Sequence, residues 1–131
     1  MDATVTLDVR NFRSAAGSGY TNIPASNART YSYRFTGGPN NDGTITEITG
    51  TGQALITVHV QADPRYHITD ITFGSNGAND LSWRSTFPPY LAVITDTNTD
   101  NIDSEYSVVI LDTVANARVL CDPAIKNRPN K

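Results

Sequence analysis

The sequence predicts an all-β protein, an antiparallel β-sandwich of immunoglobulin-like proportions with about seven to nine strands and at most short helical turns. Three observations predict this fold class. Apolar residues recur at every second position along most of the chain, which is the spacing of one face of a strand. The segments between these runs hold Gly, Asn, Asp and Pro, the residues of tight turns. No window has apolar residues at i, i+3, i+4 and i+7 over three turns, which excludes a long amphipathic helix.

The strand candidates follow one another with a turn between each pair. Val5, Leu7 and Val9 alternate with polar residues, and Tyr31, Tyr33 and Phe35 do the same. The later candidates are rich in β-branched and aromatic residues and cover residues 44–48, 53–60, 68–73, 91–95, 106–111 and 118–121. Their turn chemistry predicts one hairpin through residues 37–43 and a second one between the strands at 53–60 and 68–73. Short helical turns are expected at most at residues 75–81 and 113–117.

Strands at this spacing are typical of two antiparallel sheets packed face to face. A small barrel or jelly roll stays open as the alternative, because spacing does not fix connectivity. We expect one sandwich domain over residues 1–121, and an irregular tail over residues 122–131 that packs on it and covers a sheet edge. Residues 14–27 form the longest stretch without a strand pattern, and loops of this length are often functional or mobile.

Size and composition exclude several classes of protein. The 131 residues and 14.2 kDa fit one domain. A net charge of -3 and a pI near 5.1 give no electrostatic footprint for nucleic acid or anionic lipid. No apolar run is long enough to cross a membrane, and the N-terminus does not have the pattern of a secretory signal. With a single cysteine, the chain is expected to be cytoplasmic.

The acidic loop after residue 95 is the candidate metal site. Its oxygen donors follow the pattern D-x-N-x-D-x-x-D and are Asp96, Asn98, Asp100 and Asp103. The spacing matches the start of an EF-hand loop, but Asn101 replaces its glycine and Ser107 its bidentate glutamate. A Ca²⁺ site between strands and a solvated turn both stay open. Residues 85–117 contain five acids and no Lys or Arg, a field that would attract a cation or a basic partner.

The chain has no recognisable catalytic motif. His59 and His67 are expected on consecutive strands, but a zinc site usually needs three or four ligands. Cys121 has no activating signature around it and is interpreted as a buried structural thiol. There is no G-x-S-x-G elbow and no phosphate-binding P-loop. The sequence therefore predicts a protein that is not an enzyme.

Loop aromatics are the remaining candidates for ligand binding. They are Tyr20, Trp83 and Tyr90, with Arg84 as the adjacent cation. Such rings stack on sugars or bases, although a single tryptophan in an all-β domain is more often a plug between the sheets. Nucleic-acid binding would need more cations among these aromatics.

The C-terminal residues Asp122, Pro123, Ile125, Asn127 and Pro129 form the pattern D-P-x-I-x-N-x-P after two strand candidates. This pattern resembles the C-terminus of small uncharacterised bacterial proteins of the DP-EP family. More loosely, Trp83-Arg84 and the same terminal pattern are similar to the PixA/AidA inclusion-body proteins. The resemblance implies a bacterial, cytoplasmic all-β protein, and it implies no catalytic residue.

Two functions follow from these observations. The first is a non-enzymatic β-sandwich without a cofactor that mediates protein association or assembly, and we expect it to be a homo-oligomer. The second is a small-ligand or Ca²⁺-binding module that uses the loop aromatics or the acidic loop. Both hypotheses exclude nucleic acid and membrane as partners.

Overall fold

The computed structural model describes residues 3–38, 41, 43, 45–48, 50, 52–74, 80–87, 89–99, 102–122 and 124–128. These residues form eleven strands, and none of them lies in a helix that could span a membrane. The strands are β1 (Ala3–Arg10), β2 (Thr21–Pro24), β3 (Thr30–Gly37), β4 (Ile45–Ile48), β5 (Ala54–Val60), β6 (Tyr66–Phe73), β7 (Leu81–Phe87), β8 (Leu91–Asp96), β9 (Ile102–Asp112), β10 (Ala117–Cys121) and β11 (Ala124–Arg128). The predicted all-β sandwich is confirmed.

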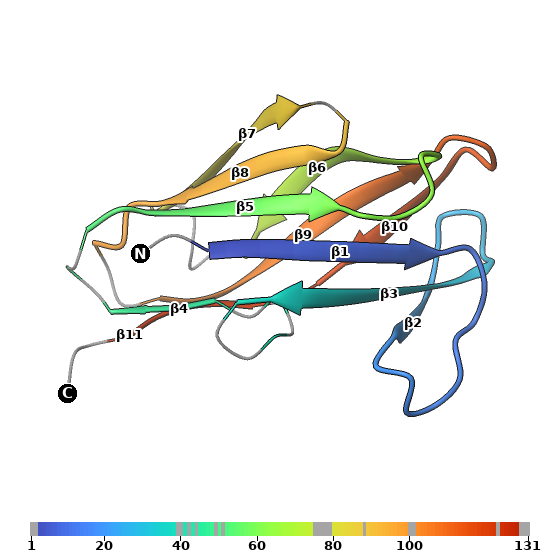
Figure 1. Ribbon diagram of the computed structural model, residues 1–131, viewed down its shortest axis with the longest axis horizontal. Coiled ribbons are helices and arrows are strands. Elements are labelled where there is room, and N and C mark those ends of the chain that lie inside the picture. The colour runs from blue at the N-terminus through green and yellow to red at the C-terminus, as the bar shows by residue number, and fades with distance from the viewer. Residues whose placement is uncertain are drawn as a thin grey trace.

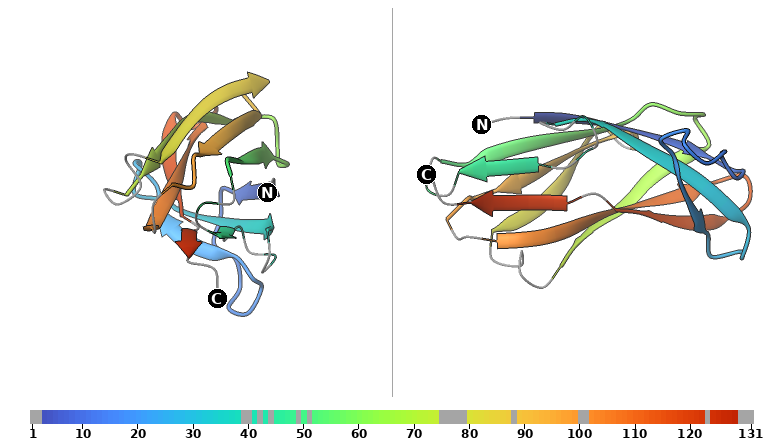
Figure 2. Two further views of the ribbon diagram at one scale, coloured as in Figure 1. Left: turned by 90° about the vertical axis from the view of Figure 1, so that its left-hand side faces the viewer. Right: turned by 90° about the horizontal axis from the view of Figure 1, so that it is seen from below.

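The strands form two sheets that lie one over the other (Figures 1 and 2). The large sheet has the order β2-β3-β1-β5-β8-β7. The small sheet has the order β10-β9-β11-β4, and β6 also pairs with β9. Most pairs are antiparallel, but β1 with β5 and β4 with β11 are parallel. The sheets are therefore mixed, because several neighbouring strands are joined through crossovers between the sheets and not through hairpins.

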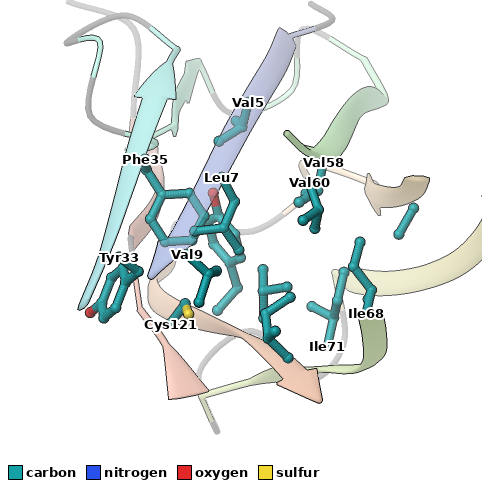
Figure 3. Packing of buried hydrophobic residues seen from close by; sticks show 14 of the residues in the cluster. Val5, Leu7, Val9, Tyr33, Phe35, Val58, Val60, Ile68, Ile71 and Cys121 are labelled. Carbon is teal, nitrogen blue, oxygen red and sulfur yellow. The ribbon is translucent and has the colours of Figure 1, made fainter. Parts of the chain in front are cut away.

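The core lies between the two sheets and uses the alternation seen in the sequence. Burial alternates residue by residue along β5, where Ile56 and Val58 are fully buried and Thr57 is half-buried. Figure 3 shows Leu7 of the large sheet on one side of this layer and Ile71 of the small sheet on the other. Each fully buried aliphatic side chain contributes about 1.5–3 kcal/mol to the free energy of unfolding. The period-two pattern is thus the main source of the fold's stability.

Backbone hydrogen bonds also join the two sheets directly at both sides of the sandwich. On one side, the amide of Ser26 donates to the carbonyl of Arg118 at 3.0 Å. On the other side, Ile68 of β6 donates to the carbonyl of Pro89 at 2.8 Å, while Val60 of β5 donates to that of Tyr90 at 2.9 Å. Residues 89 and 90 therefore bridge the sheets, and this connection positions the candidate site described below.

Both predicted hairpins are wrong. Residues 37–43 do turn, since the amide of Gly43 donates to the carbonyl of Gly37 at 3.1 Å, but β4 then joins the small sheet and does not pair with β3. In the same way, β5 lies in the large sheet and β6 in the small one. Turn residues mark a local reversal of the chain, whereas pairing is decided by which faces can be buried together. Of the two places where a short helical turn was expected at most, residues 113–116 form the turn between β9 and β10 and contain no helix. At the other place, Leu81 begins β7, and residues 75–79 lie outside the described part.

Two segments expected to be irregular contain strands. The stretch 14–27 contains β2, and Ser14 is buried with its hydroxyl 2.8 Å from that of Ser32. The tail contains β11, which lies between β9 and β4 inside the small sheet and so does not cover an edge. These short strands were missed because they have no alternating apolar residues and are specified by backbone pairing with their neighbours.

Candidate functional site

The structure contains an open pocket where β5 ends and β8 begins. Its volume is about 470 Å³, within the range of small-molecule sites. It is lined by residues 59–62, Pro64, Tyr90 and Leu91, and we call it the β5–β8 pocket. Apolar side chains and ring faces dominate this lining, and the polar side chains are those of His59 and Gln61. Such a pocket is suited to an apolar or aromatic group that one or two polar contacts orient.

Tyr90 is fixed as a wall of the pocket. Its hydroxyl donates a hydrogen bond to the carbonyl oxygen of Pro64 at 2.8 Å. Its ring meets that of His67 edge to face, with 5.5 Å between ring centroids and an interplanar angle of 88°. Its backbone carbonyl also accepts from Val60, so both the backbone and the ring of Tyr90 are held in place. A pre-organised wall lowers the entropy lost when a ligand binds.

Both histidines lie near this wall although β5 and β6 belong to different sheets. His59 lines the pocket directly, while His67 supports Tyr90 from β6. The sequence predicted that a hairpin would bring the two histidines close together, but that hairpin does not form, and each histidine instead lies near Tyr90. Neither imidazole has a hydrogen bond or ion pair to a carboxylate of the described residues, so the pair has no orienting group for acid–base chemistry.

The other predicted ligand-binding residues lie elsewhere. Tyr20 donates its hydroxyl hydrogen bond to Asp8 of β1 and stacks with Arg10. Trp83 is half-buried in β7 and packs against the core, in agreement with the plug interpretation. Arg84 is exposed on the same strand. Of the four predicted residues, Tyr90 is the one that lies at the pocket.

Two residues of the predicted calcium loop are buried and hydrogen-bonded within the protein. The Oδ1 atom of Asp96 accepts from the amide of Asn98 at 2.9 Å, and the side-chain amide of Asn98 donates to the carbonyl of Gly52 at 3.2 Å. Asp80 lies next to them and accepts from both the amide and the hydroxyl of Thr99. Nothing in the sequence around Asp80 pointed to this role.

The rest of that loop lies outside what the structure describes. Asp100 is not described, and for Asp103 only the backbone is, as the second residue of β9. Within the described residues, no group of three His, Cys, Asp or Glu side chains is arranged to hold a metal ion. The calcium hypothesis stays a prediction for the acidic loop.

Sequence reasoning missed the charged cluster around Asp112 entirely. This carboxylate is fully buried and accepts two hydrogen bonds from the Arg65 guanidinium, at 2.7 and 2.9 Å, and one from the Tyr31 hydroxyl at 2.6 Å. Burial by itself would raise the pKa of Asp112, but these hydrogen bonds outweigh it and lower the pKa. One signal was available, since Asp112 ends a strongly apolar strand and begins a four-residue turn.

Cys121 and the terminal pattern serve the fold. Burial raises the pKa of the Cys121 thiol well above its ordinary value, and the neighbouring Asp122 adds to the shift, so the sulfur is held as an unreactive thiol. Asp122 accepts from the Ser107 hydroxyl at 2.5 Å, and its amide donates to the Tyr33 hydroxyl at 3.2 Å. Ile125 and Asn127 lie in β11, whereas Pro123 and Pro129 are outside the described residues.

Comparison with protein-family models and with curated proteins finds no match for this chain.

Proposed function

We propose that this protein is a non-enzymatic binding module whose β5–β8 pocket takes an apolar or aromatic group. The observation that carries the proposal is the pocket of about 470 Å³, with its mostly apolar lining and its fixed Tyr90 wall. His59 and Gln61 supply the polar contacts that would orient a ligand at the rim. Of the two functions predicted from the sequence, ligand binding therefore has the better support.

The absence of catalytic geometry among the described residues supports a binding role. A general base needs an orienting partner, and neither histidine contacts a described carboxylate. The Cys121 thiol lies in the core, out of reach of any substrate. An apolar wall and one imidazole are sufficient to select a ligand by shape.

Titration with indole and with benzyl alcohol, followed by amide chemical shifts, tests the proposal. We expect shifts that saturate and are centred on residues 59–62, Tyr90 and Leu91. Leu91→Ala removes an apolar wall and should weaken binding about fivefold, because a few buried methyl groups contribute about 1 kcal/mol. Leu55→Ala is the matched control, since Leu55 is equally half-buried on the large sheet but lies outside the pocket. If neither probe shifts the pocket residues at millimolar concentration, the proposal is wrong.

Protein association is the second candidate, and the outer face of the small sheet favours it. Leu120 is 50% exposed there, and the half-buried Leu111 lies on the same face of the neighbouring β9, two positions from the register partner of Leu120. Apolar side chains that are accessible and lie near one another are typical of protein contacts. Sedimentation at increasing concentration should reveal self-association that Leu120→Lys abolishes. A strictly monomeric wild-type protein at millimolar concentration would count against a homo-oligomer.

A further inference from the structure

An acid-free, arginine-rich segment stands out in a protein of net negative charge. Residues 9–41 contain four arginines and no Asp or Glu, although the whole chain has a net charge of -3. The segment covers the end of β1, the connection to β2, and all of β2 and β3, which are adjacent strands at one side of the large sheet. The fold thus places these arginines on neighbouring strands and their connections, and the β1–β2 connection and β2 are visible at the lower right of Figure 1.

Arg10 is held in a fixed orientation by aromatic rings. Its guanidinium carbon lies 3.9 Å from the centroid of the Tyr20 ring and 5.7 Å from that of Phe12. Its Nε atom is 3.8 Å from Asp8 Oδ2, which is an ion pair but longer than a hydrogen bond. Stacking fixes the plane of a guanidinium and leaves its N–H edge available to an oxygen acceptor.

Arg34 adds a second cation beside the first. It is exposed, and on β3 it lies directly across from Asp8 of β1. The Tyr20 hydroxyl already donates to that same carboxylate. The partly exposed Asp8 forms an ion pair with Arg10, and within the described part of the chain no carboxylate forms an ion pair with Arg34. The cluster has surplus positive charge.

An exposed aromatic side chain completes the surface. Phe12 is 54% exposed, and its ring borders the Arg10 guanidinium. Gly19 lies close against Arg34, since a Cβ atom at this glycine would stand 3.4 Å from Arg34 Nε. We call Arg10, Phe12, Tyr20 and Arg34 the arginine–aromatic cluster.

We propose that the arginine–aromatic cluster binds an acidic segment of a partner polypeptide. Two partner carboxylates would pair with the Arg10 and Arg34 guanidinium groups, and an apolar partner side chain would pack on Phe12. Paired guanidinium and carboxylate groups match in planar geometry and form two parallel hydrogen bonds. Nucleic acid is the less favoured polyanion, because a protein of net charge -3 lacks the extended positive field that attracts a long phosphate backbone.

The test uses fluorescence anisotropy with a short labelled peptide of glutamates around one central phenylalanine. We expect binding that weakens as salt rises from about 20 to 200 mM, because screening shortens the range of these charges. Arg10→Gln and Arg34→Gln should each weaken it about tenfold, and Arg10→Lys should recover it in part. Arg84→Gln is the matched control, because Arg84 is an exposed arginine on the opposite edge of the large sheet. Thermal unfolding of each variant checks that the fold is retained.

Three results would contradict the proposal, and each has a different meaning. An equal loss with Arg84→Gln would show that only net charge matters, and unchanged affinity in Arg10→Gln and Arg34→Gln would show that the peptide binds elsewhere. A labelled oligo-dT that binds more tightly than the peptide would assign the cluster to nucleic acid instead. The pocket variant Leu91→Ala should bind the peptide normally, so this proposal and that of the β5–β8 pocket can fail independently.

Discussion

Asp112 joins three distant parts of the chain through one buried carboxylate. Its oxygens accept from Arg65 in the β5–β6 connection, from Tyr31 in β3, and from the backbone amides of Val114 and Ala115 in the following turn. Arg65 is in addition stacked 5.6 Å from the Tyr66 ring. The cluster therefore links the large sheet to the small sheet by polar contacts at one end of the core.

Asp112→Asn should be among the most destabilising isosteric substitutions in this protein. The amide keeps the shape but loses the charge that Arg65 and Tyr31 face, and removing one partner of a buried pair costs about 3–5 kcal/mol. Urea unfolding at neutral pH measures the loss. Asp70→Asn is the control, because Asp70 is exposed and accepts from the amide of Ile71, and we expect less than about 0.5 kcal/mol for it. A loss below about 1 kcal/mol for Asp112→Asn would mean that the cluster is not structural.

Gly37 shows how closely the backbones of β1 and β3 approach. Its φ is +90°, and a Cβ atom there would lie 2.3 Å from the carbonyl oxygen of Thr4. Gly37→Ala should therefore cost clearly more than the strain of positive φ alone, which is about 1 kcal/mol. Gly17→Ala isolates that strain, because Gly17 has a φ of +80° and no atom within 4 Å of the added Cβ. Equal losses of thermal stability in the two variants would contradict the steric argument.

For single residues, the sequence predicts whether a side chain is accessible or buried when this depends on its neighbours in the sequence. Tyr90 follows two prolines and was expected to be accessible, and Cys121 was expected to be buried. Asp112 and Arg65 meet across 47 positions of sequence, and no local pattern relates them. The same holds for Asp80 and Thr99, whose pairing depends on how β7 lies beside β8.

For strands, prediction succeeded where one face of the strand is buried in the core, and it failed for short strands that are held mainly by backbone pairing with a neighbour. The alternation in β1, β3 and β5 places them correctly, because a core face requires an apolar residue at every second position. β2 has Thr, Asn, Ile and Pro, and β11 has Lys, Asn and Arg, which give no such signal. Strand order was not predictable either, since crossovers between the sheets leave no local trace.

β11 is expected to be essential to the small sheet, because it is the strand that connects β4 to β9. Lys126 pairs with Asp103 of β9 on one side and with Thr46 of β4 on the other. Proline at this position removes a ladder hydrogen bond and introduces a steric clash, which costs about 3 kcal/mol or more in regular structure. Lys126→Pro should therefore lower the thermal midpoint strongly, and Lys126→Ala, which keeps the backbone bonds, should change it little. Similar midpoints for both variants would show that β11 contributes little to stability.

At the scale of the whole molecule, two surfaces of different chemistry share one sheet. The β5–β8 pocket lies where β5 ends, and the arginine–aromatic cluster lies where β1 ends, and these two strands are parallel neighbours. Both ends therefore lie at the same end of the large sheet. The backbone bonds at residues 89 and 90 and at Ser26 fasten this sheet to the small one, so both surfaces rest on a rigid support.

The titrating groups of the whole fold predict a stability profile with two limbs. The pKa of Asp112 is lowered in the folded state, so its contribution is present above the unfolded value near 4 and is lost as pH falls through the folded value. Burial raises the pKa of Tyr66 to about 12, and the pKa values of Tyr31 and Tyr33 are raised too. A raised tyrosine pKa stabilises the fold below the unfolded value near 10, and this stability is lost as pH rises through the folded value.

Urea unfolding measured across pH should therefore give a plateau between about pH 5 and 9, with losses on both sides. Tyr66→Phe tests the alkaline limb, because it keeps the buried ring and removes the hydroxyl that must ionise. This variant should match the wild type at neutral pH and lose less stability between about pH 10 and 12. Asp112→Asn should in turn flatten the acid limb, and it should also reduce the alkaline limb in part, because Asp112 contributes to the raised pKa values of Tyr31 and Tyr66. If the wild type and Tyr66→Phe decline alike above pH 10, other groups cause the alkaline loss, with the buried Cys121 thiol the next to substitute.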